Sequence, residues 1–177
     1  MNLELVVLLR LAVAVVLTGL LGWEREAVGK AAGLRTHILV GVGSALFVGL
    51  SELLVQHFAR YDDRLQFDPT RVLEAVVAGV AFLGAGMIFV SRGSSHVHGL
   101  TTAASVWSTA GVGMAVGLGR YVLAMGATAL LLLVLRGLAL LEKRSIAAES
   151  QPAAPSAETE QTAGGNRSAP GGRPVPR

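Results

Sequence analysis

Residues 102–141 read TAASVWSTAGVGMAVGLGRYVLAMGATALLLLVLRGLALL and carry two charged side chains, Arg120 and Arg136. On each side of Arg120 lies an apolar run close to the roughly 20 residues that a helix needs to cross the hydrocarbon core of a bilayer. Because so few residues separate the two runs, we expect them to form a tight antiparallel pair of helices. This stretch predicts a membrane protein and argues against an ordinary soluble domain.

Three further apolar runs lie upstream, and the composition of the whole chain agrees with a membrane location. The five runs are residues 3–22, 37–57, 72–90, 102–119 and 121–141. The 177 residues are 52% hydrophobic and 15% charged, whereas soluble proteins average about 25% charged residues. We predict an all-α, polytopic transmembrane helical bundle of about five spans in residues 1–146. Residues 147–177 are rich in Pro, Ala, Ser and Gly, and we expect a disordered cytoplasmic tail there.

Several function classes lack support in the sequence. The net charge of +3 is weak evidence for nucleic-acid binding. The chain has no cysteine, which excludes disulfides, thiolate metal sites and a cysteine nucleophile. No nucleotide-binding glycine motif, Ser/His/Asp arrangement or confined carboxylate pair occurs, so we expect no enzyme activity, catalytic residue or cofactor. His96 and His98 lack a nearby carboxylate or thiolate, and they are more typical of a solvated loop than of a metal site.

The distribution of Lys and Arg predicts the orientation, since cytoplasmic loops keep an excess of them. One side of the bundle would hold Arg25, Lys30, Arg35, Arg92, Arg136, Lys143 and Arg144, and the other Arg60, Arg64, Arg71 and Arg120, with Arg10 inside the first run. An odd number of spans places the two ends of the chain on opposite sides. We therefore predict the N-terminus outside and the C-terminus in the cytoplasm.

Arg10 is the first candidate functional residue, because it lies about two turns into the first apolar run. A charge at that depth is costly unless it faces the bundle interior, meets a carboxylate or reaches the interface. Glu52 and Glu74 lie on the same predicted half of the bundle and are candidate partners. Snorkelling to the outer interface is the alternative, and the sequence leaves both open.

The loop after the first run, residues 22–37, reads GWEREAVGKAAGLRTH. Its candidate functional residues are Glu24, Arg25, Glu26, Arg35 and Thr36. At the membrane face partial desolvation strengthens charge-assisted contacts, so the loop could bind an ion or a partner protein. The alternative is that its charges pair with one another, fix the turn between two helices and set the orientation.

Small residues recur at steps of four, as in Gly41, Ala45 and Gly49 or in Gly113 and Gly117. This spacing lets helix backbones approach closely, which favours core packing.

Gly84 and Gly86 are candidate functional residues, because they could unwind the third helix and expose backbone carbonyls to a cation. Their alternative role is close packing, as for the other glycines. Thr101 and Thr102 are the last candidates. They fit the N-cap of the fourth helix, with Ser105 and Ser108 following as hydroxyls able to bond across helices.

Four blocks together resemble the MgtC/SapB family of bacterial inner-membrane proteins. They are residues 10–11 with 19–26, GLRT at 33–36, FLGAG at 82–86 and GLTTAA at 99–104 before Trp107. The resemblance implies a multi-helix membrane domain linked to magnesium homeostasis and to growth at low magnesium. It also implies an interaction with another membrane complex such as the ATP synthase.

Two departures from the family bear on these implications. Several family members end in a small folded cytoplasmic domain, where this chain has a short polar tail. Virulence-associated members can carry Asn and Cys where this sequence has Thr101 and Ser108, which argues against a virulence role.

Two hypotheses follow. The first is a non-enzymatic regulatory protein that sits in the lipid bilayer and packs against another membrane complex. The second is a small ion transporter or channel subunit, as a homo-oligomer, in which Arg10, the carboxylates and the glycines line a path. They differ in whether the charged side chains face a hydrated route across the membrane.

Overall fold

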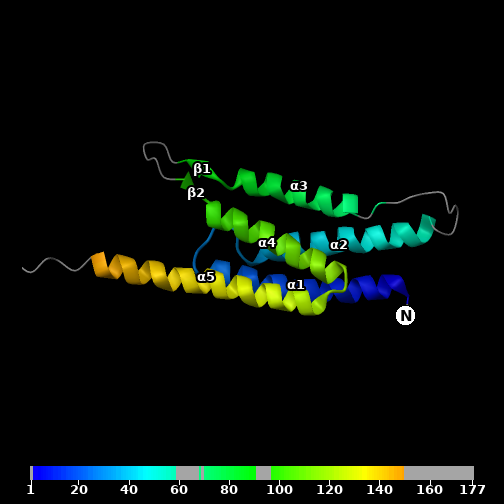
Figure 1. Cartoon of the computed structure of the whole chain (residues 1–177), viewed down its shortest axis with the longest axis horizontal. Helices are drawn as coiled ribbons and strands as arrows, with labels where there is room; N and C mark the ends of the chain where they lie inside the picture. Colours follow the sequence, from blue (N-terminus) through cyan, green and yellow to red (C-terminus); the bar gives the residue numbers. More distant parts are fainter. Residues whose placement is uncertain (1, 59–67, 69, 91–96, 150–177) are drawn as a thin grey trace, which may run out of the picture. The chain divides into compact units, whose positions relative to one another are not determined.

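The computed structural model describes residues 2–58, 68, 70–90 and 97–149. Within these residues the chain forms α1 (Leu3–Ala27), α2 (Leu34–Phe58), α3 (Thr70–Gly86), α4 (Leu100–Gly117) and α5 (Tyr121–Glu149), with two short strands, β1 (Phe89–Val90) and β2 (Val97–His98) (Figure 1). The chain divides into two compact units, Met1–Leu140 and Leu141–Arg177. The first unit holds the features described below, and the described part of the second is the end of α5.

The predicted all-α class is confirmed, and each of the predicted apolar runs carries one helix. Among the described residues, α1 and α2 are long and apolar enough to cross a membrane. The third helix has 17 residues, and the fifth is a shorter apolar helix over Tyr121–Gly137. A span by each of the last three helices remains a prediction. The predicted tail falls largely on residues 150–177, which lie outside the described residues.

The fourth helix is the centre of the packing. Its buried side chains Val112 and Val116 join a cluster with Ala14, Leu21, Ala45 and Ala124, which come from α1, α2 and α5. On its other side Val106 and Ala110 pack against Val76 and Val80 of α3. Figure 1 shows α4 lying between α3 on one side and α1 with α5 on the other.

Glycines allow this close packing, as their spacing predicts. A Cβ placed on Gly113 of α4 would lie 2.9 Å from the Cα of Gly41 in α2, and one on Gly117 would lie 2.9 Å from the carbonyl oxygen of Ala45. A Cβ on Gly49 would lie 2.7 Å from Val7 of α1. The α1, α2 and α4 backbones are therefore in near contact, and larger side chains at these glycines would force them apart.

Three helix ends differ clearly from the prediction. The fifth helix runs to Glu149, eight residues beyond the predicted end at residue 141 and three residues into the predicted tail. The first helix continues past residue 22 to Ala27, because Glu24, Arg25 and Glu26 are good helix formers although they end the apolar run. The third helix ends at Gly86, short of the predicted residue 90. Beyond it β1 pairs with β2 as an antiparallel hairpin. Strands of two residues are too short for hydropathy to reveal.

The predicted N-cap of the fourth helix is wrong. Thr101 and Thr102 lie inside α4, and the cap is Gly99, with a φ of 88° and no side-chain capping bond. A Cβ at Gly99 would collide with the carbonyl group of Met87. The chain thus turns from the hairpin into α4 through a left-handed residue packed on backbone, a place that glycine occupies without steric cost.

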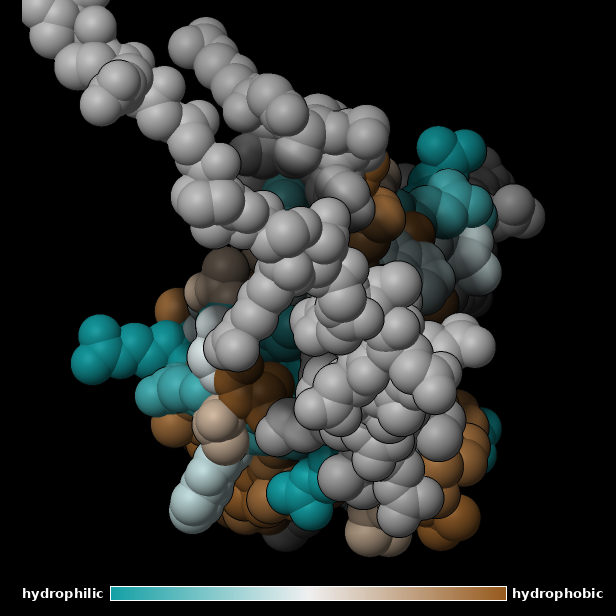
Figure 2. All heavy atoms as spheres, turned by 90° about the vertical axis from the view of Figure 1, so that its left-hand side faces the viewer, coloured by the Kyte–Doolittle hydropathy of each residue, from teal (hydrophilic) through white to brown (hydrophobic). Residues whose placement is uncertain are grey.

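Polar and apolar side chains are segregated on the surface. Figure 2 views the end of the molecule at which α1 ends and α2 begins, and hydrophilic residues project there while hydrophobic ones form the flanks. The exposed hydrophobic residues on the helix flanks include Leu39, Phe47, Phe82 and Val122, with exposed fractions of 56% or more. Such flanks are expected of helices that contact lipid, since lipid solvates apolar side chains.

Candidate functional site

Charged side chains are buried at two places, one at each end of the α1–α2 helix pair. The Glu24 cluster comprises Glu24, Arg25, His37, Thr102 and Ser105, and lies where α1 ends and α2 and α4 begin. The Arg10 cluster comprises Arg10, Glu52 and the carbonyl of Gly117, and lies where α1 begins and α2 and α4 end.

Glu24 and Arg25 form a bidentate ion pair in the last turns of α1. The Arg25 Nε donates to Glu24 Oε2 at 2.6 Å and its Nη2 donates to Oε1 at 2.9 Å. Both side chains are only 3% exposed. Neighbouring residues on a helix do not normally face each other, so the long side chains bend to meet. The pair buries no net charge, which makes its burial tolerable.

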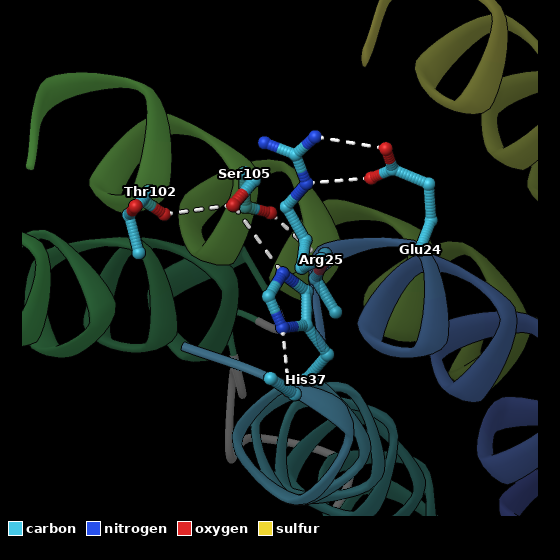
Figure 3. A network of polar contacts seen from close by, with 7 residues as sticks. Glu24, Arg25, His37, Thr102 and Ser105 are labelled. Carbon is cyan, nitrogen blue, oxygen red and sulfur yellow. Dashed lines mark hydrogen bonds and ion pairs between the residues drawn. The ribbon is translucent and has the colours of Figure 1, made fainter. Parts of the chain in front are cut away.

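His37 of α2 lies near this pair and contacts the fourth helix (Figure 3). Its ring is fully buried and contacts the Gly33 carbonyl through Nδ1 at 2.9 Å and Ser105 Oγ through Nε2 at 3.3 Å. Ser105 in turn donates to the Thr102 carbonyl at 2.8 Å. His37 thus links α2 to α4, and the Glu24–Arg25 pair of α1 lies beside this hydrogen-bonded group.

The donors of this network can be counted. A carbonyl oxygen only accepts, so Nδ1 of His37 carries the hydrogen directed at Gly33. The single hydroxyl hydrogen of Ser105 then serves either Nε2 of His37 or the carbonyl of Thr102, because one hydrogen cannot fill both positions. The network has two alternative hydrogen-bond arrangements with the same heavy-atom positions.

Not all the predicted loop residues join the Glu24 cluster. Glu26 is exposed, and its Oε2 accepts the backbone N–H of Leu34 at 2.8 Å, which satisfies one of the free donors at the start of α2. Arg35 is exposed and Thr36 is partly buried. Of the two candidate threonines, Thr102 is buried in the cluster and Thr101 is exposed.

The two candidate glycines lie at the end of α3, outside both clusters. Gly84 is helical and buried, and a Cβ there would lie 3.7 Å from Ala103 of α4. Gly86 is exposed and is the last residue of the helix. The third helix is continuous through Gly84, so this glycine does not unwind it, and its nearest neighbours on α4 lie at an ordinary packing distance.

The Arg10 cluster contains one of the two carboxylates that the sequence offered. Arg10 Nη1 lies 2.5 Å from Glu52 Oε2 and donates to the Gly117 carbonyl at 2.8 Å. The Arg10 side chain is 14% exposed and that of Glu52 is 40% exposed. Glu74 is exposed. A pocket of about 460 Å³ adjoins the pair and is also lined by Ser51, Gln56 and Thr70.

A family model and several curated relatives match the chain. The MgtC family model matches residues 11–144, which is more than half of the chain. The chain belongs to the MgtC family.

Relatives of this MgtC family member come from distant bacteria. It is 43% identical over 132 residues to YhiD of Escherichia coli K12, covering 72% of this chain and 58% of that protein. SapB of Bacillus subtilis is 37% identical over 115 residues, covering 65% and 49%. MgtC of Brucella abortus is 44% identical over 109 residues, covering 62% and 41%. The chain thus spans about half the length of these relatives. No solved structure matches it.

Family membership and the apolar helices together make the chain a membrane protein. The family match covers most of the five helices and the whole Glu24 cluster, and Arg10 lies one residue before its start. Among the described residues, no group of three or more His, Asp or Glu side chains is placed to hold a metal ion.

The part of the site that sequence reasoning missed in this MgtC family member is the pairing of His37 with Ser105. The histidine stands at the edge of an apolar run, where it marks the end of a span, and Ser105 is one of several hydroxyls in its helix. The available signal was GLRTH itself, because it places His37 one turn after Gly33 and near the charged loop. The partner lies 68 residues away, and only the packing of α2 on α4 reveals it.

Proposed function

We propose that this chain is a non-enzymatic regulatory membrane protein that acts in magnesium homeostasis, or in adaptation to low magnesium, by contacting another membrane protein complex. The name of its relative YhiD provisionally assigns that protein to magnesium transport, and other relatives are named MgtC and SapB. We place the protein in the bacterial inner membrane with its N-terminus outside and its C-terminus in the cytoplasm.

The observation that carries this proposal is that each charged cluster pairs its arginine with a glutamate of the same cluster, and that packed helices separate the two clusters. Arg25 pairs with Glu24, and Arg10 pairs with Glu52. Between the clusters the backbones of α2 and α4 nearly touch at Gly41 and Gly113. Ion conduction needs a polar path with groups that replace the hydration shell, and this interior offers none within the described residues.

The buried hydroxyls midway along the helices agree with this interpretation. Thr18, Ser44 and Thr109 are at most 2% exposed. Each donates to a carbonyl of its own helix four residues earlier, at 2.7 to 2.8 Å. A hydroxyl used in this way adds no group to a transport path.

The alternative is a small ion transporter or channel subunit. The pocket next to Arg10 favours it, since Glu52, Ser51 and Gln56 bring polar groups to one end of the bundle. The cationic Arg10 inside this pocket opposes the entry of a divalent cation. Assembly of several copies could create a path that one chain lacks.

Magnesium flux into proteoliposomes distinguishes the two functions. Purified full-length protein, the Arg10→Ala variant and empty vesicles are compared with a magnesium-sensitive dye inside the vesicles. Regulation predicts no flux above empty vesicles from correctly inserted protein. Flux that requires the protein and falls with Arg10→Ala would overturn the regulatory proposal and establish transport.

The partner is tested in cells grown at low magnesium. Family resemblance points to the ATP synthase, and we propose a complex of that kind as the partner. A photo-crosslinking residue replaces Phe82 or Val122, which are exposed on α3 and α5, and replacement at the buried Val116 is the control. Crosslinks to one membrane complex from an exposed position alone support regulation by contact, and crosslinks to copies of this chain alone oppose it.

A further inference from the structure

A groove of about 980 Å³ lies between α2 and α3 and has no role in either proposed function. One wall comes from α2 and the other from α3, and nearly all its lining is apolar, with Phe47, Val76, Val80 and Leu83 among the residues. The hydroxyl of Ser44 also lines it and is already bonded to the Val40 carbonyl of its own helix. The Ser44 hydroxyl therefore needs no hydrogen-bond acceptor from a molecule bound in the groove.

Small residues open this groove on both walls. Gly43 of α2 and Gly79 of α3 line it, and a Cβ on either would meet no atom within 4 Å. They differ in this from Gly41 and Gly113, which are in tight contact inside the fold. The groove is thus open between two helices of a membrane protein, where lipid solvates apolar surfaces.

The length of the groove distinguishes between occupants. Along α3 it runs from Arg71 to Leu83, which is about 18 Å at 1.5 Å per residue. A single leaflet of the hydrocarbon core is about 15 Å thick, half of the roughly 30 Å that a complete transmembrane helix must cross. The groove therefore matches one lipid acyl chain, whereas a partner helix would find contacts along only half of its length.

The end of the groove carries a pair of opposite charges. Asp68 and Arg71 line it there, and Arg71 Nε lies 3.9 Å from Asp68 Oδ2. The Arg71 side chain is 83% exposed and that of Asp68 is 53% exposed. Asp68 is held in place because its Oδ1 accepts the N–H of Thr70 at 2.9 Å and the Thr70 hydroxyl at 2.6 Å. The Thr70 hydroxyl bond, followed by the backbone bond, lowers the pKa of the Asp68 carboxyl, so it is ionised at neutral pH.

We propose that the α2–α3 groove binds a zwitterionic phospholipid, with one acyl chain along the groove, its phosphate at Arg71 and its ammonium group at Asp68. A guanidinium and a carboxylate side by side match the phosphate and the ammonium of such a headgroup. The lipid belongs to the leaflet next to the N-terminus, because α3 begins at that end of the bundle. This inference requires a membrane protein and does not depend on the choice between regulation and transport.

Native mass spectrometry of the full-length protein in mild detergent tests the acyl-chain site. The probe is phosphatidylethanolamine, added to delipidated protein. Gly79→Leu fills the groove and should weaken binding about tenfold or more. Gly126→Leu is the matched control, because a Cβ there also meets no atom within 4 Å and Gly126 lies on α5 away from the groove. We expect the control to bind as the wild type does.

The headgroup is tested with phosphatidylglycerol of the same acyl chains. The wild type should prefer phosphatidylethanolamine. Arg71→Gln should weaken both lipids about tenfold through loss of the phosphate contact, and Asp68→Asn should remove the preference between them. Both residues are exposed, so these variants test the proposal even if Gly79→Leu fails to fold.

Three results would overturn the proposal. The first is equal lipid binding by Gly79→Leu, Gly126→Leu and the wild type. The second is binding of phosphatidylglycerol as tightly as phosphatidylethanolamine by the wild type. The third is the absence of any lipid adduct together with a dimer mass that Gly79→Leu abolishes, since the groove would then hold a second copy of the chain.

Discussion

Arg10 reaches outside its own helix for both of its hydrogen-bond acceptors, which are Glu52 of α2 and the carbonyl of Gly117, the last residue of α4. Its Nε is buried without a hydrogen-bond partner. One guanidinium thus joins three helices at one end of the bundle, and a single nitrogen, Nη1, donates both bonds.

Replacement of Arg10 should therefore destabilise the bundle. We expect Arg10→Ala to lower the free energy of unfolding by about 2 kcal/mol, because it leaves the Glu52 carboxylate without its partner. Arg10→Lys should cost less, since it keeps the charge. Unfolding in detergent by heat or by SDS measures both changes.

A double-mutant cycle identifies the partner. Arg10→Ala combined with Glu52→Gln should show a coupling energy, whereas Arg10→Ala combined with Glu74→Gln should be additive. Coupling to Glu74, or to neither carboxylate, would contradict the ion pair described here.

Ser105 provides a second test at this scale. Ser105→Ala removes the side-chain partner of His37 Nε2 inside the bundle, and we expect a loss of about 1 to 2 kcal/mol in stability. Ser44→Ala is a matched control, because that serine is also buried but donates only to its own helix. The control should cost less than Ser105→Ala. Equal effects would show that the bond across helices contributes nothing to stability.

The sequence predicted these residues in part. It reduced the partners of Arg10 to Glu52 or Glu74, and the choice between them depends on which helix ends meet, which composition does not encode. It also allowed the loop charges to pair with one another, as Glu24 and Arg25 do. The pairing of His37 with Ser105 needed the crossing of α2 on α4, so no local pattern predicted it.

Elements were predicted better than residues were. Hydropathy located all five helices, because a run of apolar residues is a strong signal over the length of a helix. It failed at the ends of α1 and α3, where the outcome depends on a few residues. Helix-forming residues such as Glu24 and Arg25 continue α1 beyond its apolar run, and a glycine followed by a short hairpin ends α3.

The contact between α2 and α4 predicts how these elements respond to mutation. Gly113→Ala places a methyl group on the backbone of Gly41 and should cost about 2 kcal/mol in stability through overpacking. Gly111→Ala, on an open face of the same helix, should be neutral or slightly stabilising, since alanine favours helix. The SDS concentration at half-unfolding measures both. A harmless Gly113→Ala would mean that the two helices are further apart than described.

At the scale of the whole molecule, the orientation is the prediction most easily tested. The chain has no cysteine, so a single introduced cysteine is the only thiol. Glu4→Cys and Lys30→Cys place it at exposed sites at opposite ends of α1. With the N-terminus outside, an impermeant maleimide on spheroplasts should label Glu4→Cys alone, and lysis should make Lys30→Cys accessible. The reverse pattern would invert the predicted orientation.

The family, too, could be identified from the sequence, because its four blocks are local and ordered. The α2–α3 groove could not, since its walls are ordinary apolar and small residues that become a groove only when two helices are held slightly apart. Grooves of this kind between helices depend on the packing of the complete bundle, which the sequence does not show.

The ion pair between Arg10 and Glu52 has a consequence for the order of events during synthesis. Its partners are 42 residues apart in the chain, so Arg10 is synthesised well before Glu52. An arginine within an inserting helix costs up to roughly 3 kcal/mol, the value for the helix centre, and Arg10 meets its carboxylate only on α2. We therefore expect α1 to wait at the insertion machinery until α2 has emerged, and the two helices to enter the bilayer together as a hairpin.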